Sequence, residues 1–64
     1  MRETELWSRL RQLLGPAYTP VWADSVVHAS LGGRTVTEAL AAALPVKQIW
    51  LAACLSLEVP EHER

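Results

Sequence analysis

The residues Pro45 to Leu57, PVKQIWLAACLSL, limit most strongly what this chain can fold into. Ten of these thirteen residues are apolar, counting alanine and proline, and Lys47 is the only charged one. A helix that is apolar on nearly all sides is normally buried on most of them. Because the rest of a 64-residue chain is too short to surround it, we expect the central helix of a small bundle with one face left uncovered.

Length and composition define the class of protein. Sixty-four residues suffice for one domain, 1–64, and a domain of this size buries only about 60% of its unfolded surface. Three Trp residues and a half-hydrophobic composition allow a core without disulfides. A net charge of −1 gives no general attraction to nucleic acid or anionic lipid. Because the chain lacks both a long apolar run and a signal-peptide pattern, we expect a cytoplasmic protein without a membrane span.

Stop signals and apolar spacing predict two helices in the first half of the chain. The first runs from a cap at Thr4 to Leu14 and ends at Gly15-Pro16, where glycine takes the left-handed cap and proline cannot continue the helix. The second ends at Gly32-Gly33. Its start is open, because proline is tolerated in a first turn and both Pro16 and Pro20 can supply one; Thr19 caps the helix in the second case.

Two further helices are predicted in the second half. Thr35-Val-Thr-Glu38 fits the capping-box pattern and begins a short helix through Ala43. The fourth helix opens at Pro45, and Leu44 before it has no side-chain acceptor, so this helix start should lack a side-chain cap. The charged tail, residues 60–64, is expected to fray.

These elements predict an all-α fold, namely a compact four-helix orthogonal bundle with a helix-turn-helix-like C-terminal half. The aromatic and aliphatic residues at helical spacing should meet in one core. The core residues expected from this spacing are Trp7, Leu10, Tyr18, Trp22, Leu40, Ile49, Trp50 and Leu57.

A set of residues spread over nearly the whole chain carries a resemblance. The set is Trp7, Gly15-Pro-Ala-Tyr18, Trp22, Leu31-Gly-Gly-Arg-Thr-Val36, Glu38-Ala-Leu-Ala-Ala42, Pro45, Lys47, Trp50, Cys54 and Leu57. With these features the chain resembles a small actinobacterial family, domain-of-unknown-function family 3046. The resemblance implies a short cytoplasmic protein, in some members encoded beside the recombinase RecA, with no assigned activity and hence no functional residue to transfer. The chain departs from the family pattern at Pro20, at Ala43, where glycine is usual, and at Leu44, where a capping Asp is usual.

The span Thr35 to Ala52 has the spacing of a helix-turn-helix. Its marker positions are Ala39 as the small residue, Ala43 in the turn and Ile49 as the buried aliphatic. A DNA-reading helix needs polar and basic side chains at its exposed N-terminal positions and several cations for phosphate. This chain offers Lys47 and Gln48 there and then leucines, so DNA binding is the less favoured alternative.

Residues with catalytic or metal-binding chemistry are few. His28 and His62 are far apart in the chain and have no carboxylate pattern beside them. We expect His28 to lie at the rim of the fold or at a helix cap. Cys54 lies between apolar neighbours, whereas a nucleophilic thiol needs an electropositive and partly exposed setting. We therefore expect no enzyme activity, no cofactor and no metal.

The fourth predicted helix carries the strongest functional signal. At about 100° per residue, one of its faces is formed by Lys47, Gln48, Leu51 and Leu55, opposite the face that should be buried. Two leucines one turn apart on the solvent side favour a contact surface, either for an unknown protein partner or for weak homo-oligomerisation. Arg34 could add a contact to a partner carboxylate, or could instead bind the C-terminus of a neighbouring helix.

Overall fold

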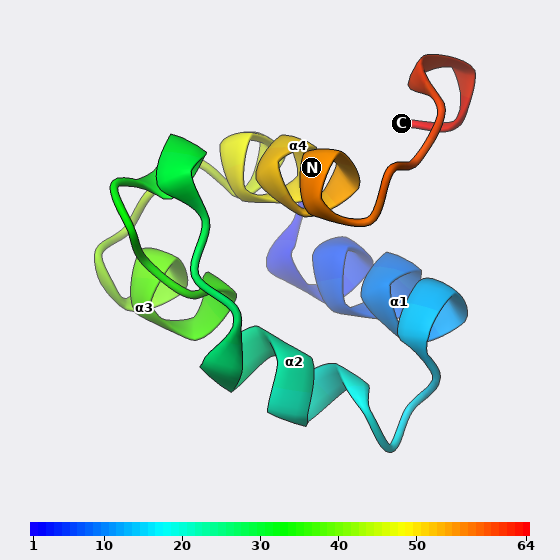
Figure 1. Ribbon diagram of the computed structural model, residues 1–64, viewed down its shortest axis with the longest axis horizontal. Helices are drawn as coiled ribbons and strands as arrows, with labels where there is room; N and C mark the ends of the chain where they lie inside the picture. Colours follow the sequence, from blue (N-terminus) through cyan, green and yellow to red (C-terminus); the bar gives the residue numbers. More distant parts are fainter.

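The computed structural model describes residues 1–64 as four α-helices and two short 3₁₀ turns (Figure 1). The elements are α1 (Glu3–Leu14), α2 (Thr19–Ser25), η1 (Ala29–Leu31), α3 (Val36–Ala41), α4 (Val46–Ser56) and η2 (Glu61–Glu63). Each helix packs against the next, and α4 also packs against α1 and η1, so the four helices form a closed ring of contacts. The predicted all-α bundle is confirmed.

Helix α1 has no side-chain cap at its start, and a backbone hydrogen bond closes its end. Arg2 occupies the N-cap position without a side-chain hydrogen bond, so the predicted cap at Thr4 is wrong: Thr4 lies inside the first turn. Glu3 and Glu5 also lie in this turn, where the positive end of the helix dipole stabilises their carboxylates. At the other end the helix stops at Gly15 as predicted, and the Gly15 N–H donates to the Arg11 carbonyl; with φ +84° and ψ 150° the glycine does not take the predicted left-handed helical cap.

Helix α2 starts at Thr19, so of the two prolines that could lie in its first turn, Pro16 and Pro20, it is the second that does. Pro20 therefore lies in the first turn, where the missing N–H costs little. Thr19 is the first helical residue rather than the cap, and its hydroxyl donates to the Gly15 carbonyl at 2.7 Å. This bond ties the start of α2 to the end of α1.

The predicted extension of α2 to Gly32-Gly33 is wrong, because the helix ends at Ser25. Val26 follows with extended backbone angles, φ −88° and ψ 120°. His28 then forms an isolated bridge with Arg34, in which its N–H donates to the Arg34 carbonyl at 3.0 Å. The residues between them turn through η1 and close a small loop in place of two further helical turns.

Helix α3 opens with the predicted capping box. The Thr35 hydroxyl accepts the Glu38 N–H at 3.1 Å, and the Glu38 carboxylate accepts the Thr35 N–H at 2.9 Å. The helix ends at Ala41, two residues earlier than predicted, because Ala43 takes a left-handed conformation with φ +60°. The Ala43 N–H donates to Leu40 and the Leu44 N–H to Ala39, the hydrogen-bond pair of a Schellman motif.

Helix α4 repeats this pattern at its own end. Pro45 is the N-cap and Val46 the first helical residue, so the prediction that the helix opens at Pro45 after a cap at Leu44 is wrong by one residue; the start has no side-chain cap hydrogen bond. After the helix Glu58 has φ +57°, its N–H donates to Leu55, and the Val59 N–H donates to Cys54. This second Schellman motif turns the chain so that Val59 is buried. Residues 60–64, for which the sequence predicts fraying, form the turn η2, and the Arg64 guanidinium donates to the Val59 carbonyl.

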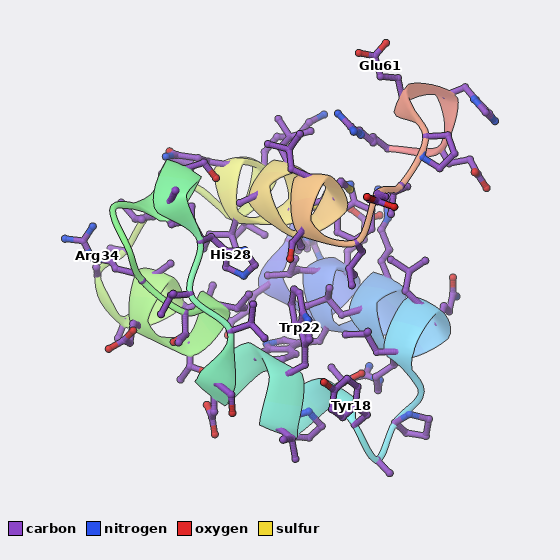
Figure 2. All side chains as sticks on the ribbon, in the orientation of Figure 1. Tyr18, Trp22, His28, Arg34 and Glu61 are labelled. Carbon is purple, nitrogen blue, oxygen red and sulfur yellow. The ribbon has the colours of Figure 1, made fainter.

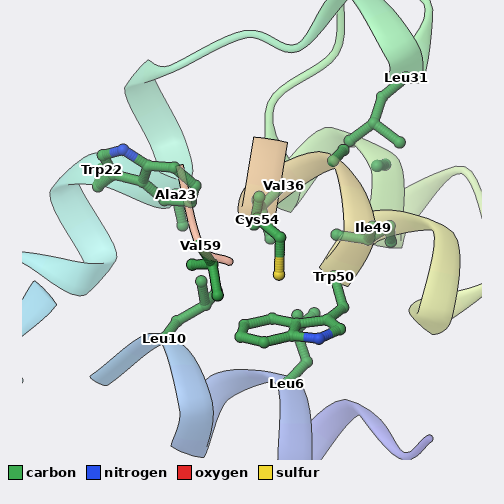
Figure 3. Close-up of a cluster of buried hydrophobic side chains, with 13 residues drawn as sticks. Leu6, Leu10, Trp22, Ala23, Leu31, Val36, Ile49, Trp50, Cys54 and Val59 are labelled. Atoms are coloured by element: carbon green, nitrogen blue, oxygen red, sulfur yellow. The ribbon is translucent and has the colours of Figure 1, made fainter. Parts of the chain in front are cut away.

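The core gathers around α4 (Figure 3). Its thirteen buried residues are Leu6, Leu10, Trp22, Ala23, Leu31, Val36, Ala39, Ile49, Trp50, Ala52, Ala53, Cys54 and Val59. Of the predicted core, Trp7, Leu40 and Leu57 are partly buried against this cluster. Tyr18 is 52% exposed, so its assignment to the core is wrong. It is the N-cap of α2 and stands outside the helical stripe that faces inward.

We predict that Trp50→Ala is the most destabilising single truncation. The indole is 3% exposed and lies among side chains of α1, α4 and the segment after α4. Emptying such a site costs about 3–5 kcal/mol, a large part of the stability of a small domain. Urea or thermal unfolding followed by circular dichroism should show a much lower midpoint for Trp50→Ala, or no cooperative transition at all. The control Leu55→Ala, at an exposed position of the same helix, should change stability by less than about 0.5 kcal/mol. Unchanged melting of Trp50→Ala would contradict the core described here.

Candidate functional site

The candidate site is the α4 face, defined by Lys47, Gln48, Leu51 and Leu55. All four side chains are exposed, Leu51 by 39% and Leu55 by 60%. The opposite side of the same helix is enclosed, since Ile49, Trp50, Ala52, Ala53 and Cys54 are buried. The helical phase inferred from the sequence therefore agrees with the structure.

A shallow hollow of about 400 Å³ adjoins the α4 face. One wall comes from α4, with Ala52, Leu55 and Ser56, and the other from the loop that contains η1. Val27 lies on that second wall and is 60% exposed. The hollow extends the apolar surface of Leu55 across to Val27.

Val27 is a further residue of this surface, although its helical spacing from Ala23 and Leu31 predicts that it belongs to an apolar stripe of the second helix. That assignment is wrong, because α2 ends two residues earlier. The β-branched pair Val26-Val27 is the signal that could have revealed it, since such residues favour extended backbone over helix.

Arg34 lies in the loop on the other side of η1 and not on the α4 face. Its guanidinium donates to the Leu31 carbonyl at 3.0 Å, at the C-terminal end of η1 (Figure 2). A Cβ at Gly32 would approach the Arg34 Nη1 to 2.8 Å, which shows how closely this side chain folds over the turn. Of the two roles expected for Arg34, the structure shows the contact with a neighbouring helix end, although the residue is exposed.

His28 points into the bundle, as Figure 2 shows, and is only 5% exposed. Its ring lies 5.3 Å from the Trp22 ring, between centroids, and its Nε2 makes no hydrogen bond. Burial disfavours the charged imidazolium, so the pKa of His28 is lowered from its usual value. The expectation of a rim or capping histidine is wrong, because the side chain is part of the interior.

Cys54 is also enclosed, at 0% exposure. Burial raises the pKa of its thiol, and the positive charges of Arg64 and Arg9 oppose that shift less strongly. The thiol is therefore protonated near neutral pH, unlike the thiolate of a nucleophilic cysteine.

A second hollow, of about 520 Å³, lies between α1 and the tail. The Arg9 guanidinium stands over the Trp50 ring, 5.4 Å from its centroid, and also approaches Glu5 at 3.5 Å. Arg64 and Glu63 line the same hollow, so both signs of charge are present. This mixture selects no particular ligand.

Two other kinds of site can be judged from the whole chain. No group of three or more His, Cys, Asp or Glu side chains is placed to hold a metal ion. None of the helices has both the length and the apolar character that crossing a membrane requires.

The fold and the exposed helix face define a small all-α protein with uncovered leucines on α4. The chain belongs to the family described as "Protein of unknown function (DUF3046)", whose match covers residues 1–62 of the 64. The resemblance inferred from the sequence is thereby confirmed. No curated protein and no solved structure matches the chain.

We predict that the protein loses stability on mild acidification because of His28. Its pKa is lowered in the folded state from the usual 6.5, so the unfolded chain binds a proton that the folded chain does not. The free energy of unfolding should therefore be highest above the unfolded pKa. It should fall, by at most about 1.4 kcal/mol per pH unit from this residue, as pH drops below that value.

Urea unfolding between about pH 7.5 and pH 5 measures this dependence. His28→Gln removes the titrating ring and should flatten the curve in that window. His62→Gln is the matched control, because the side chain of His62 is 82% exposed and should leave the curve unchanged. A His28→Gln curve that keeps the wild-type slope would contradict the assignment to His28.

Proposed function

We propose that the protein is a non-catalytic interaction module that binds another protein through the α4 face. The observation that carries the proposal is the exposure of Leu51 and Leu55 on a helix whose other side is the centre of the core. The two leucines are one turn apart, and Val27 adds a third exposed aliphatic side chain across the hollow. Grouped apolar exposure of this kind is typical of a contact surface.

The proposed contact is weak and reversible. Burying one exposed leucine contributes about 1.5–3 kcal/mol at most, whereas joining two bodies costs about 4–15 kcal/mol. Leu51 and Leu55 therefore need support from Val27 and from the aliphatic stem of Lys47. A contact of this size suits a regulatory or adaptor role better than a permanent complex.

The proposal includes a cytoplasmic setting and no chemistry of its own. Supporting it, Cys54 and His28, which have the chemistry of a nucleophile and a base, are enclosed in the core. A single unpaired thiol also suits a reducing compartment.

We predict that Leu51→Glu/Leu55→Glu abolishes partner capture without unfolding the protein. Both side chains are exposed, so charges are tolerated in the free chain but not in an apolar contact. Tagged wild type and the double variant should be compared in pull-downs from the native host, with circular dichroism as the folding control. Val21→Glu is the matched surface control, since Val21 is 56% exposed on α2. Equal capture by all three proteins would refute the proposed face.

A second candidate function is DNA binding by a helix-turn-helix formed by α3 and α4. The observations that favour it are the buried Ala39 and Ile49 and the left-handed Ala43 in the turn between the helices. The exposed surface of α4 is unfavourable, because Lys47 is its single basic residue. Phosphate binding normally uses several cations on one face.

We therefore predict no measurable duplex binding in a gel shift at low salt. If DNA binding is the function, micromolar affinity should be seen, and it should weaken steeply with added salt. Lys47→Ala should then reduce the affinity, because it removes the cation of the α4 face. Binding with both properties would replace the protein-interaction proposal with the DNA-binding one.

A further inference from the structure

We propose that the occupant of the α4 face is a second copy of this chain, packed with its α4 antiparallel to the first across a two-fold axis. This inference rests on the proposed function and names the partner of the same face. Two observations support it, the electrostatics of α4 and the placement of its exposed residues, and the area that these residues offer sets the strength of the pairing.

The charges on α4 are placed against its own dipole. Lys47 lies in the first turn, near the positive end, and no acidic residue lies in that turn. Glu58 follows the last turn, near the negative end, and no basic residue lies in that last turn. Within one helix this order is unfavourable at both ends. The side chains of Lys47 and Glu58 also form no hydrogen bond or ion pair elsewhere in the chain.

In an antiparallel pair, Lys47 and Glu58 would each lie near a helix end of opposite sign on the other copy. The N-terminal end of each α4 would lie beside the C-terminal end of the other, so the two dipoles attract. Lys47 would approach the negative helix end and Glu58 of the second copy, and the same pair would form again by symmetry. A two-fold contact of this kind needs a surface complementary to itself, and α4 provides one.

The apolar residues fit the same antiparallel arrangement. A two-fold axis that sets Leu51 opposite Leu55 of the second copy passes level with residue 53. That axis also sets Lys47 beyond the last turn of the second α4, which ends at Ser56 and is followed by Glu58. The axis that pairs these leucines therefore also brings Lys47 to the negative end of the second α4.

The available area makes the pair weak. A standard interface takes about 800 Å² from each partner, close to a fifth of the 4020 Å² surface of this chain. One face of an 11-residue helix supplies less than that. We therefore expect a dissociation constant of about 10 µM to 1 mM.

Charge reversal tests the pairing by sedimentation equilibrium over about 10 µM to 2 mM protein. Lys47→Glu and Glu58→Lys each place like charges together in the dimer, so each should weaken self-association about three- to tenfold. Both changes also suit the dipole of α4 itself, so neither should lower the melting temperature. Weaker association without loss of folding is the expected signature.

Mixing the two variants gives the sharper result. In a Lys47→Glu and Glu58→Lys heterodimer, both ion pairs are restored with opposite charges, so the equimolar mixture should associate more strongly than either variant alone. The doubly reversed chain should also self-associate like the wild type, within about twofold. Failure of the mixture to associate more strongly would overturn the antiparallel pairing.

The outcomes also separate this inference from the proposed function. A wild type that stays monomeric up to 2 mM overturns self-pairing. If Leu51→Glu/Leu55→Glu still abolishes partner capture in that case, the interaction module stands with a different partner. If capture is insensitive as well, both proposals fall.

Discussion

Burial of the Trp50 indole is the interaction on which the rest of the structure depends. It brings α4 against Leu6 and Leu10 of α1, and α4 in turn holds α3 and the η1 loop. The remaining helix–helix contacts, α1 with α2 and α2 with α3, depend on α2, which is only seven residues long. A domain this small has one core and no second cluster to replace it. Because α4 is the element around which the core gathers, its remaining uncovered side lies directly over the core.

Much of the fold is predictable because its signals are local. The capping box at Thr35, the stop at Gly15 and the inward face of α4 each follow from side-chain chemistry or period within a few residues. The end of α2 is not predictable in this way. The apolar residues from Trp22 to Leu31 continue a helical period, yet the chain leaves the helix at Val26 because the His28–Arg34 bridge and β-branched residues favour an extended segment. That bridge joins residues on either side of a turn, so no helical period reveals it.

The candidate site shows the same division between local and non-local information. The exposure of Leu51 and Leu55 follows from the phase of one helix, and the sequence predicts it correctly. Val27 joins them only because the loop carrying η1 folds back beside α4, which depends on the tertiary structure. Arg34 was expected at this surface from its charge alone, but its guanidinium closes the same loop on the Leu31 carbonyl. The loop thus supplies one wall of the hollow while its only cation is used to hold its shape.

The left-handed Ala43 has a consequence for how much stability this fold retains. An L-residue in that region costs roughly 1–2 kcal/mol, while glycine there loses about 0.5–1 kcal/mol through its more flexible unfolded chain. Ala43 is exposed and lies outside both the core and the α4 face. The glycine usual at this position in the family that the sequence resembles would keep the same Schellman turn with less strain. The Ala43 methyl group therefore makes the fold less stable than the same backbone with glycine at this position. Replacing it would raise the free energy of unfolding without changing a residue of the core or of the α4 face.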